Sequence, residues 1–385
     1  MRQYDYIITG SGCAGLSLVL RMLSSPKLAD KKILLIDQSP KKDNDRTWCF
    51  WEKSPGFFEP VVYRSWQRLG VYSKYLTAEQ DIAPYTYKMI RGIDFYNYCF
   101  RIIGKSASVS RLEASVVSVG TNSAGEAVAE TSVGSFTAQF IFNSIIWESG
   151  SRKRGEHRLL QHFKGYTIRT AEPVFDPGFA TLMDFRVKQT DGTSFVYVLP
   201  LSTSEALVEY TMFSGTVLEQ GIYDQRLDNY ISRIPGVYAY EVTDTEYGVI
   251  PMTTHRFRRS SGSVINIGTA GGQTKASSGY TFSFIQKQSH EIVYNLETGN
   301  FPVGSRDRKQ KKFDWYDATL LNILANDRLP GAAVFTRLFR SNPMQDVFAF
   351  LDNETTLKQD LSIVRSLPIL PFLRAAVVEA PRVFF

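Results

Sequence analysis

Three glycines near the N-terminus, Gly10, Gly12 and Gly15, have the spacing G-x-G-x-x-G. This spacing is typical of a dinucleotide-binding turn when it joins a strand to a helix. Residues 4–9 predict a short apolar strand, and residues 16–23 predict an apolar helix. In such a turn Gly10 permits the tight bend, Gly12 lets a pyrophosphate approach the backbone, and Gly15 lets the helix pack on the strand. The free N–H groups at the start of the helix would bind the phosphate.

An acidic residue follows this turn at the position where a dinucleotide site needs one. A second strand is predicted at residues 32–37, and it ends in Asp37, whose carboxylate can accept hydrogen bonds from ribose hydroxyls. The complete order of strand, turn, helix, strand and acid favours a dinucleotide site over a glycine-rich turn that binds nothing. The place of the motif at the N-terminus favours FAD, but many NAD enzymes begin in the same way.

A second glycine turn lies late in the chain. An apolar strand at 264–268 leads into Gly268, Gly271 and Gly272, and a helix is predicted at 283–296. FAD-binding oxidoreductases often have a second phosphate- and ribityl-binding turn here, usually with Gly-Asp after the strand. Thr269 stands at the position of that Asp, which leaves the ribityl contact open. The alternative is an ordinary turn.

The pattern of elements predicts an α/β fold with a Rossmann-type FAD-binding domain of three layers, ββα. A helix is expected near 95–101, a strand at 111–117 and a β-meander over 119–150, whereas the β-like runs 194–199 and 206–211 predict an inserted sheet. We therefore expect the FAD-binding domain in 1–155, a β-rich substrate domain in 156–255, a return to the FAD-binding domain in 256–300, and a helical region in 301–385.

Composition narrows the classes of function. The chain has 385 residues and a net charge of +6, but its Lys and Arg residues form short scattered clusters rather than one stripe, so no nucleic-acid partner is expected. The spacing of the three Cys and four His residues predicts no metal site. No uninterrupted apolar run is long enough to span a bilayer, and the polar start predicts no signal peptide, so a reduced, cytosolic compartment is expected.

Further segments resemble the lycopene cyclases of carotenoid biosynthesis, of the flavoprotein β-cyclase type, over nearly the whole chain. The resemblance rests on the N-terminal turn and on the segments 46–51, 182–186, 195–202, 207–211, 248–252 and 268–280. It implies an apolar carotenoid substrate and FAD held in the reduced state, with NADPH as the reductant. It also implies an intramolecular lyase or isomerase that closes the linear ψ-ends of lycopene to rings, with β rings favoured and with no net redox change.

Cyclisation of a ψ-end needs an acid that is shielded from water, because a proton must pass to a double bond. Glu209 lies in the otherwise apolar run 206–211, and strand alternation puts Leu207, Glu209 and Thr211 on one face. The pattern alone favours a solvent-facing residue, whereas the resemblance favours Glu209 as the acid. Tyr210 stands where the family usually carries a second acid, so the role of a carboxylate pair would fall on Glu209 alone. Asp184 is a second candidate, with a structural hydrogen-bonding role as the alternative.

Aromatic faces near the acid would attract the cation that protonation creates. Trp48, Trp51, Tyr197 and Tyr280 are the candidates, and core packing is the alternative for each. The segments 334–340 and 364–378 mix apolar residues with arginines, which predicts peripheral contact with a membrane surface, with packing as a helical tail as the alternative. The oligomeric state stays open.

Two other classes of function also fit these patterns. One is an FAD-dependent isoprenoid or carotenoid reductase or hydroxylase on the same scaffold, which would change the mass of its substrate. The other is a non-catalytic carotenoid-binding protein.

Overall fold

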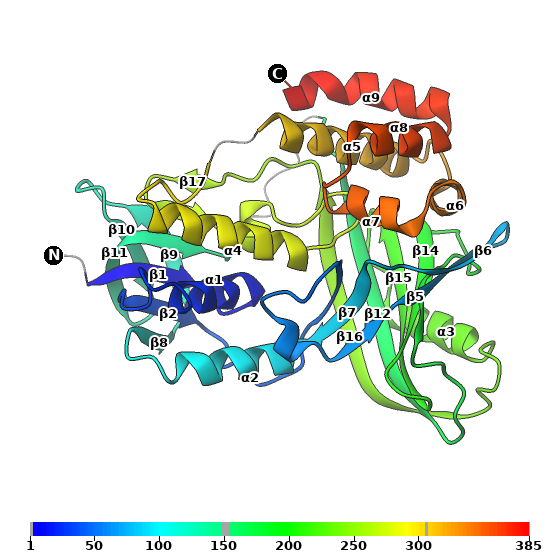
Figure 1. Ribbon diagram of the computed structural model, residues 1–385, viewed down its shortest axis with the longest axis horizontal. Coiled ribbons are helices and arrows are strands. Elements are labelled where there is room, and N and C mark those ends of the chain that lie inside the picture. The colour runs from blue at the N-terminus through cyan, green and yellow to red at the C-terminus, as the bar shows by residue number, and fades with distance from the viewer. Residues whose placement is uncertain (1–2, 148–154, 305–306, 385) are drawn as a thin grey trace.

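The computed structural model describes residues 3–147, 155–304 and 307–384. Within these ranges the chain forms three β-sheets, with helices on the first sheet and on both faces of the second (Figure 1). The segment 148–154, at the end of the predicted first domain and of the predicted meander, lies outside the described residues.

The first sheet has a parallel core with the spatial order β17-β18-β11-β1-β2-β8. Its strands are β1 (Tyr4–Thr9), β2 (Ile33–Asp37), β8 (Val109–Glu113), β9 (Val116–Thr121), β10 (Ala127–Thr131), β11 (Gly134–Asn143), β17 (Ser260–Ser261) and β18 (Val264–Asn266). Strands β9 and β10 extend from β11 as an antiparallel meander. Parallel strands that are covered on both faces consist of nearly continuous apolar residues. This is why the sequence predicted β1 and β2.

The two faces of the first sheet are covered differently. Ile8 and Leu35 face a helical layer of α1 (Cys13–Leu23), α2 (Gly92–Ile103) and α4 (Phe282–Glu297). Ile7 and Leu34 face the small alanines of the meander strands. The predicted three-layer ββα arrangement is therefore confirmed, with the meander as one layer, the parallel sheet as the second and the helices as the third.

The second sheet has seven strands in the order β16-β12-β15-β14-β13-β5-β6. They are β5 (Arg68–Ser73), β6 (Leu76–Asp81), β12 (Arg158–Thr170), β13 (Phe179–Asp184), β14 (Thr193–Pro200), β15 (Glu205–Ser214) and β16 (Tyr240–Thr253). One face packs on α3 (Gln220–Ile231). Because β5 pairs in parallel with β13, the segment 1–155 contributes to both sheets, a long-range pairing that no local pattern indicates.

A three-stranded sheet lies between the two large ones, in the order β3-β7-β4. It consists of β3 (Thr47–Glu52), β4 (Arg64–Trp66) and β7 (Thr86–Arg91), with a short 3-10 helix η1 (Glu59–Val61) before β4. A second short 3-10 helix, η2 (Gly268–Gly271), follows β18 and leads toward α4. Most of the polar-to-aromatic segment 46–51 thus forms β3 of this small sheet.

The C-terminal region is helical, as expected, with α5 (Arg308–Ala325), α6 (Gly331–Ser341), α7 (Met344–Leu351), α8 (Leu357–Ser366) and α9 (Ile369–Phe384). Helix α9 is the outermost of these, at the top of Figure 1. The segment 334–340, expected at a lipid surface, lies in α6 and buries Val334, Phe335, Leu338 and Phe339 in the core, so those side chains are not available to lipid. No helix within the described ranges is both long and apolar enough to cross a membrane.

Candidate active site

The N-terminal glycine turn has the geometry that a pyrophosphate site needs. Gly10 has a φ of +98°, which favours glycine, and a Cβ on Gly15 would lie 2.0 Å from the carbonyl oxygen of Gly10. By contrast, a Cβ on Gly12 would meet nothing within 4 Å. Gly12 is the N-cap of α1 and supplies no side-chain cap. The turn is therefore tightly packed where helix meets strand and open where a phosphate would lie.

Asp37 is joined to this turn. One of its carboxylate oxygens accepts hydrogen bonds from the backbone N–H and the hydroxyl of Ser11, at 2.6 and 2.9 Å, and the other accepts from the N–H of Ser39 at 2.7 Å. Asp37 and Ser11 also line a cavity of about 260 Å³, together with Arg111. The carboxylate thus fixes the loop and still borders a space that could hold a ribose.

The second glycine turn packs against the first. Gly268 has a φ of +58°, and a Cβ there would lie 2.7 Å from the Cβ of Ala14 in α1. A Cβ on Gly271 would lie 2.3 Å from the carbonyl oxygen of Asn266, and Gly272 ends η2 in the left-handed conformation. Thr269 borders the large cavity described next. The two glycine turns therefore touch where Gly268 meets Ala14 at the start of α1.

A cavity of about 650 Å³ lies where the three sheets meet, a volume within the range of ligand sites. Its walls come from β3, β7, β12, β14, β15 and β16 and from the segment between η2 and α4. Trp48, Tyr197, Glu209 and Tyr280 line it, as the sequence predicts for a site. Trp51 does not; it stacks on Phe348 in the core, with ring centroids 4.6 Å apart.

Glu209 has a carboxylate partner in this cavity, Glu246 on β16. The central strand β12 separates the two, and Gly165 of β12 is registered opposite both Glu209 and Glu246. Residues directly opposite each other in an antiparallel pair project to the same face. Because Gly165 has no side chain, the two carboxyl groups approach each other across it, close enough for one proton to be shared between them.

Two threonines orient this pair. The hydroxyl of Thr211, two residues along β15, donates to Oε1 of Glu209 at 2.7 Å. The hydroxyl of Thr47, at the start of β3, donates to Oε2 of Glu246 at 2.6 Å. The segment 46–51 therefore reaches the carboxyl pair directly, which gives a physical reason for a polar residue at the start of an aromatic strand.

The electrostatics of the pair favour a protonated acid. Burial raises the pKa of Glu209 well above its usual range, and repulsion by Glu246 and the hydrogen bond between the two add to the rise. Burial and the charge of Asp244 also raise the pKa of Glu246, but the hydrogen bonds from Glu209 and Thr47 oppose that rise. Because two buried carboxylates repel each other, the pair gives up one proton more readily than both, and one carboxyl group stays protonated.

Neutral hydroxyl and thiol groups surround the pair. Tyr280 is hydrogen-bonded to Tyr87 and Tyr197, and burial raises its pKa to about 12. Burial also raises the pKa values of Tyr87, Tyr197 and Cys49, so all of these side chains are uncharged at neutral pH. The site thus combines a buried acid with aromatic walls that carry no charge of their own.

Tyr210 and Asp184 lie away from the cavity. Tyr210, at the position of the family's second acid, faces α3, where its hydroxyl accepts from Arg226 at 2.9 Å. Asp184 accepts three hydrogen bonds from Arg186, at 2.7 to 2.9 Å, and one from the hydroxyl of Tyr230 at 2.9 Å. The structure therefore does not bring Asp184 to Glu209, and its contacts are those of a residue that fixes the end of β13.

The sequence did not lead us to Glu246, and we expected the role of a carboxylate pair to fall on Glu209 alone. The structure corrects this expectation, because it places Glu246 beside Glu209. Glu246 stands two residues before the quoted segment 248–252, on a strand whose alternation puts it on the same face as Ile250. That alternation was the sequence feature from which Glu246 could have been recognised as a residue of the site. Nothing in the sequence alone aligns Glu246 with Glu209, because a third strand lies between them.

The chain is similar in sequence to a known family and to a curated protein. The family described as "Lycopene cyclase protein" matches residues 5–377. A lycopene beta-cyclase of Pantoea ananas is 25% identical over 260 residues, which are 65% of this chain and 63% of that protein. The match thus spans less than two thirds of the curated relative.

Solved structures of flavin-dependent enzymes share the fold. The flavin-dependent brominase Bmp2 is 14% identical with a TM-score of 0.62, over 98% of this chain and 99% of that one. The p-nitrophenol 4-monooxygenase PnpA of Pseudomonas putida is 16% identical with a TM-score of 0.58, over 98% and 99%. A geranylgeranyl bacteriochlorophyll reductase-like protein of Thermoplasma acidophilum is 12% identical with a TM-score of 0.56, over 100% and 98%. These likenesses concern the fold, whereas the family match covers nearly the whole sequence, and the chain therefore belongs to the lycopene cyclase family.

Proposed function

We propose that the protein is a lycopene cyclase that closes the linear ψ-ends of lycopene to rings, with β rings favoured, by acid-initiated carbocation chemistry. The observation that carries the proposal is a buried carboxyl group, Glu209, whose raised pKa favours its protonated form, in a cavity that Trp48, Tyr197 and Tyr280 also line. The family match and the name of the Pantoea ananas relative support it. A hydrocarbon has no group to hydrogen-bond, so such a cavity suits it.

The proposed reaction is a proton transfer followed by ring closure. The carboxyl group of Glu209 gives its proton to the terminal double bond, so an O–H bond breaks and a C–H bond forms. The neighbouring double bond then attacks the tertiary cation, and a C–C bond closes the ring. Loss of a ring proton to a carboxylate restores the acid. No electrons are gained or lost, so substrate and product are isomers.

Aromatic side chains would stabilise the cation while it lasts. Trp48, Tyr197 and Tyr280 line the cavity with Glu209, and each aromatic face contributes about 0.5–2 kcal/mol of cation–π attraction. Neutral tyrosines are needed for this role, because a tyrosinate would capture the proton. The raised pKa values of Tyr197 and Tyr280 keep them neutral.

We also propose FAD as the cofactor, reduced by NADPH. The turn of Gly10, Gly12 and Gly15 would hold the pyrophosphate, Asp37 the ribose, and the segment 268–272 the second phosphate and ribityl contacts. The open space at Gly12 fits such a group. When bound in its reduced, anionic form, FAD would supply negative charge that stabilises a nearby carbocation.

A turnover assay tests the proposal. The purified protein, loaded with FAD and reduced anaerobically, would be given lycopene in lipid vesicles, and the pigments separated by chromatography and weighed by mass spectrometry. The proposal predicts a new pigment with the mass of lycopene. A product heavier or lighter than lycopene would favour the hydroxylase or reductase alternative, and tight binding without turnover would favour a carotenoid-binding protein.

Access to a substrate that dissolves in bilayers suggests contact with a cytoplasmic membrane surface, and we propose α8 and α9 for it. The apolar face of these helices consists of Leu357, Leu361, Val364, Ile369, Leu370, Leu373, Val377 and Val378, each between 44% and 72% exposed. Between 361 and 384 every exposed charged residue is an arginine. Apolar side chains with flanking cations match an anionic lipid surface.

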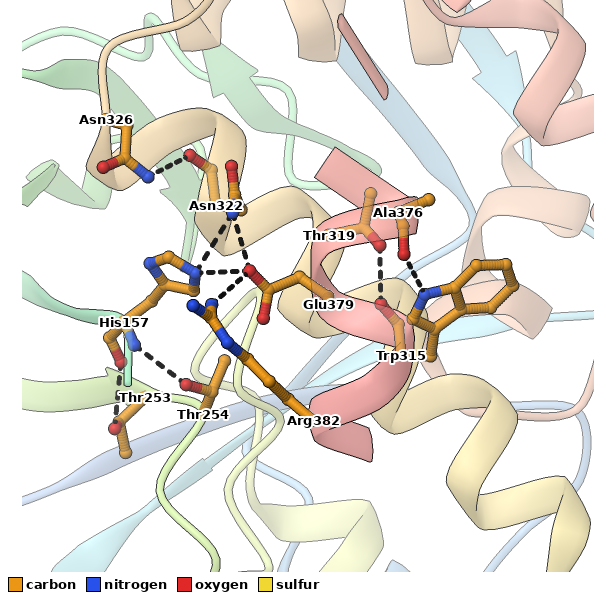
Figure 2. A network of polar contacts seen from close by, with 10 residues as sticks. All are labelled: His157, Thr253, Thr254, Trp315, Thr319, Asn322, Asn326, Ala376, Glu379 and Arg382. Carbon is orange, nitrogen blue, oxygen red and sulfur yellow. Dashed lines mark hydrogen bonds and ion pairs between the residues drawn. The ribbon is translucent and has the colours of Figure 1, made fainter. Parts of the chain in front are cut away.

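The opposite side of α9 is fixed to the protein, so the apolar face is held outward (Figure 2). Glu379 reaches inward to Nε2 of His157 at 2.8 Å and accepts from Asn322 at 2.6 Å. Trp315 of α5 donates from its indole nitrogen to the carbonyl oxygen of Ala376 at 2.8 Å. The buried side of α9 thus places Glu379 beside the apolar Phe372, Ala375 and Val383, and the side that faces outward is apolar as well.

A further inference from the structure

The carboxyl pair is built around a gap in the central strand. A Cβ on Gly165 would lie 3.0 Å from Cγ and 3.2 Å from Oε1 of Glu246, and 3.0 Å from Cδ1 of Leu207, so a larger residue at 165 would have to displace Glu246, Leu207 or both. Gly165 is buried in the middle of β12, where a glycine weakens a strand because it loses more conformational freedom on folding than other residues. The close approach of the Glu209 and Glu246 side chains across β12 explains why a glycine stands at this position.

One oxygen of the pair needs a proton from the other carboxyl group. Oε2 of Glu246 accepts from Thr47, but Oε1 of Glu246 is buried and receives no ordinary hydrogen bond from the residues that the structure describes. Leaving a buried carboxylate oxygen without a donor is costly. A proton on Glu209 removes that cost, because it lies between the two carboxyl groups.

Resting on the proposed cyclase function, we propose that Glu246 is a positioning residue that shares one proton with Glu209 and keeps that proton on Glu209 until substrate is bound. The charge of Glu246 disfavours loss of the proton to water. When Glu209 has protonated the double bond, two adjacent carboxylates remain, and this makes Glu209 the base that recovers the ring proton. The pair thus ends each cycle with the one proton with which it began.

The proposal predicts a change in pH dependence when Glu246 loses its charge. Glu209 must be protonated to act, and its raised pKa sets the pH above which activity falls. In Glu246→Gln the repulsion is gone and a side-chain amide can donate to Glu209, so the pKa of Glu209 falls and the basic limb of the kcat profile moves to lower pH by about one unit or more. The control is Glu241→Gln, an exposed carboxyl on the same strand, which should leave the profile unchanged.

A second measurement does not depend on turnover. An infrared pH titration of the FAD-loaded protein, without carotene, follows the C=O stretching band of protonated carboxyl groups. The band of the wild-type pair should persist to a pH at least about one unit higher than in Glu246→Gln and should vanish in a Glu209→Gln/Glu246→Gln double variant.

The two measurements separate the failure of this proposal from that of the proposed function. Equal band midpoints in wild-type protein and Glu246→Gln would overturn the shared proton, even if the protein cyclises lycopene. If the midpoint shifts but the protein does not convert lycopene, the shared proton is supported and the proposed cyclase function is overturned.

Discussion

Gly165 and Glu246 lie opposite each other on β12 and β16, and the missing side chain of Gly165 is the space into which the Glu246 carboxyl group fits. On the other side of β12, Gly165 is registered with Glu209. One glycine thus brings together two acids that are far apart in the sequence and on strands that do not touch.

Gly165→Ala should separate the acids without removing either. The added methyl group would displace Glu246, weaken its hydrogen bond to Glu209, and lower the pKa of Glu209, so the basic limb of the activity profile should move to lower pH. We expect kcat at the optimum to fall by about tenfold, which is less than the roughly 10²–10⁴-fold typical of removing an acid–base group. Gly120→Ala is the matched control, since a Cβ on that strand glycine of β9 would meet nothing within 4 Å. An unchanged profile in Gly165→Ala would mean that the gap does not set the distance between the carboxyl groups.

Two glycines of the N-terminal turn should respond differently to alanine. A Cβ on Gly12 meets open space, and its φ of −83° suits an L side chain, so Gly12→Ala should fold normally but lose FAD affinity by about tenfold or more, which is about 1.4 kcal/mol. A Cβ on Gly15 would collide with the carbonyl oxygen of Gly10, so Gly15→Ala should lower the melting temperature. Flavin fluorescence titration and circular dichroism measure the two effects. Equal flavin retention by wild type and Gly12→Ala would exclude the turn as a pyrophosphate site.

Asp184 should matter for stability rather than for chemistry. Asp184→Asn weakens the hydrogen bonds from Arg186 and Tyr230 at a buried position, so the free energy of unfolding should fall by about 2 kcal/mol. Cyclisation measured well below the melting temperature should stay within about twofold of the wild-type rate, because Asp184 does not line the cavity. Loss of turnover in a stably folded Asp184→Asn protein would show that Asp184 takes part in the reaction.

The apolar face of α8 and α9 predicts sedimentation with lipid. Binding should be stronger to vesicles that contain phosphatidylglycerol than to pure phosphatidylcholine, and salt should weaken it. Changing Leu370, Leu373 and Val377 together to Ser should reduce binding by about tenfold or more, since each exposed apolar side chain contributes about 1–2 kcal/mol when buried.

The control for this experiment removes exposed apolar side chains elsewhere. A triple Ser variant at Tyr75, Val217 and Tyr238, all strongly exposed and distant from the C-terminal helices in sequence, should bind vesicles like wild type. If the α9 variant instead changes only the oligomeric state, the face joins two copies of the chain and the lipid proposal fails.

The parts of the fold that local patterns determine were predictable. The first glycine turn, its strands and the helix at 282–297 follow from apolar periodicity and from glycines at positions where a Cβ has no room. Glu209 became the candidate acid through the resemblance to the lycopene cyclases, because the strand pattern alone favoured a solvent-facing residue. The parts that depend on distant pairing were not. Strand β5 pairs with β13 of the second sheet, and Glu246 meets Glu209 across the intervening strand β12. No local sequence pattern indicates either relationship.

The most direct test of the central claim is the cyclisation rate of Glu209→Gln under reducing conditions, measured beside its FAD content. Gln keeps the size of the side chain and its contact with Thr211 but cannot give a proton to a double bond. The account predicts a loss of about a thousandfold in kcat with full FAD binding and an unchanged melting profile. Near-normal formation of an isomer of lycopene by this variant would contradict it.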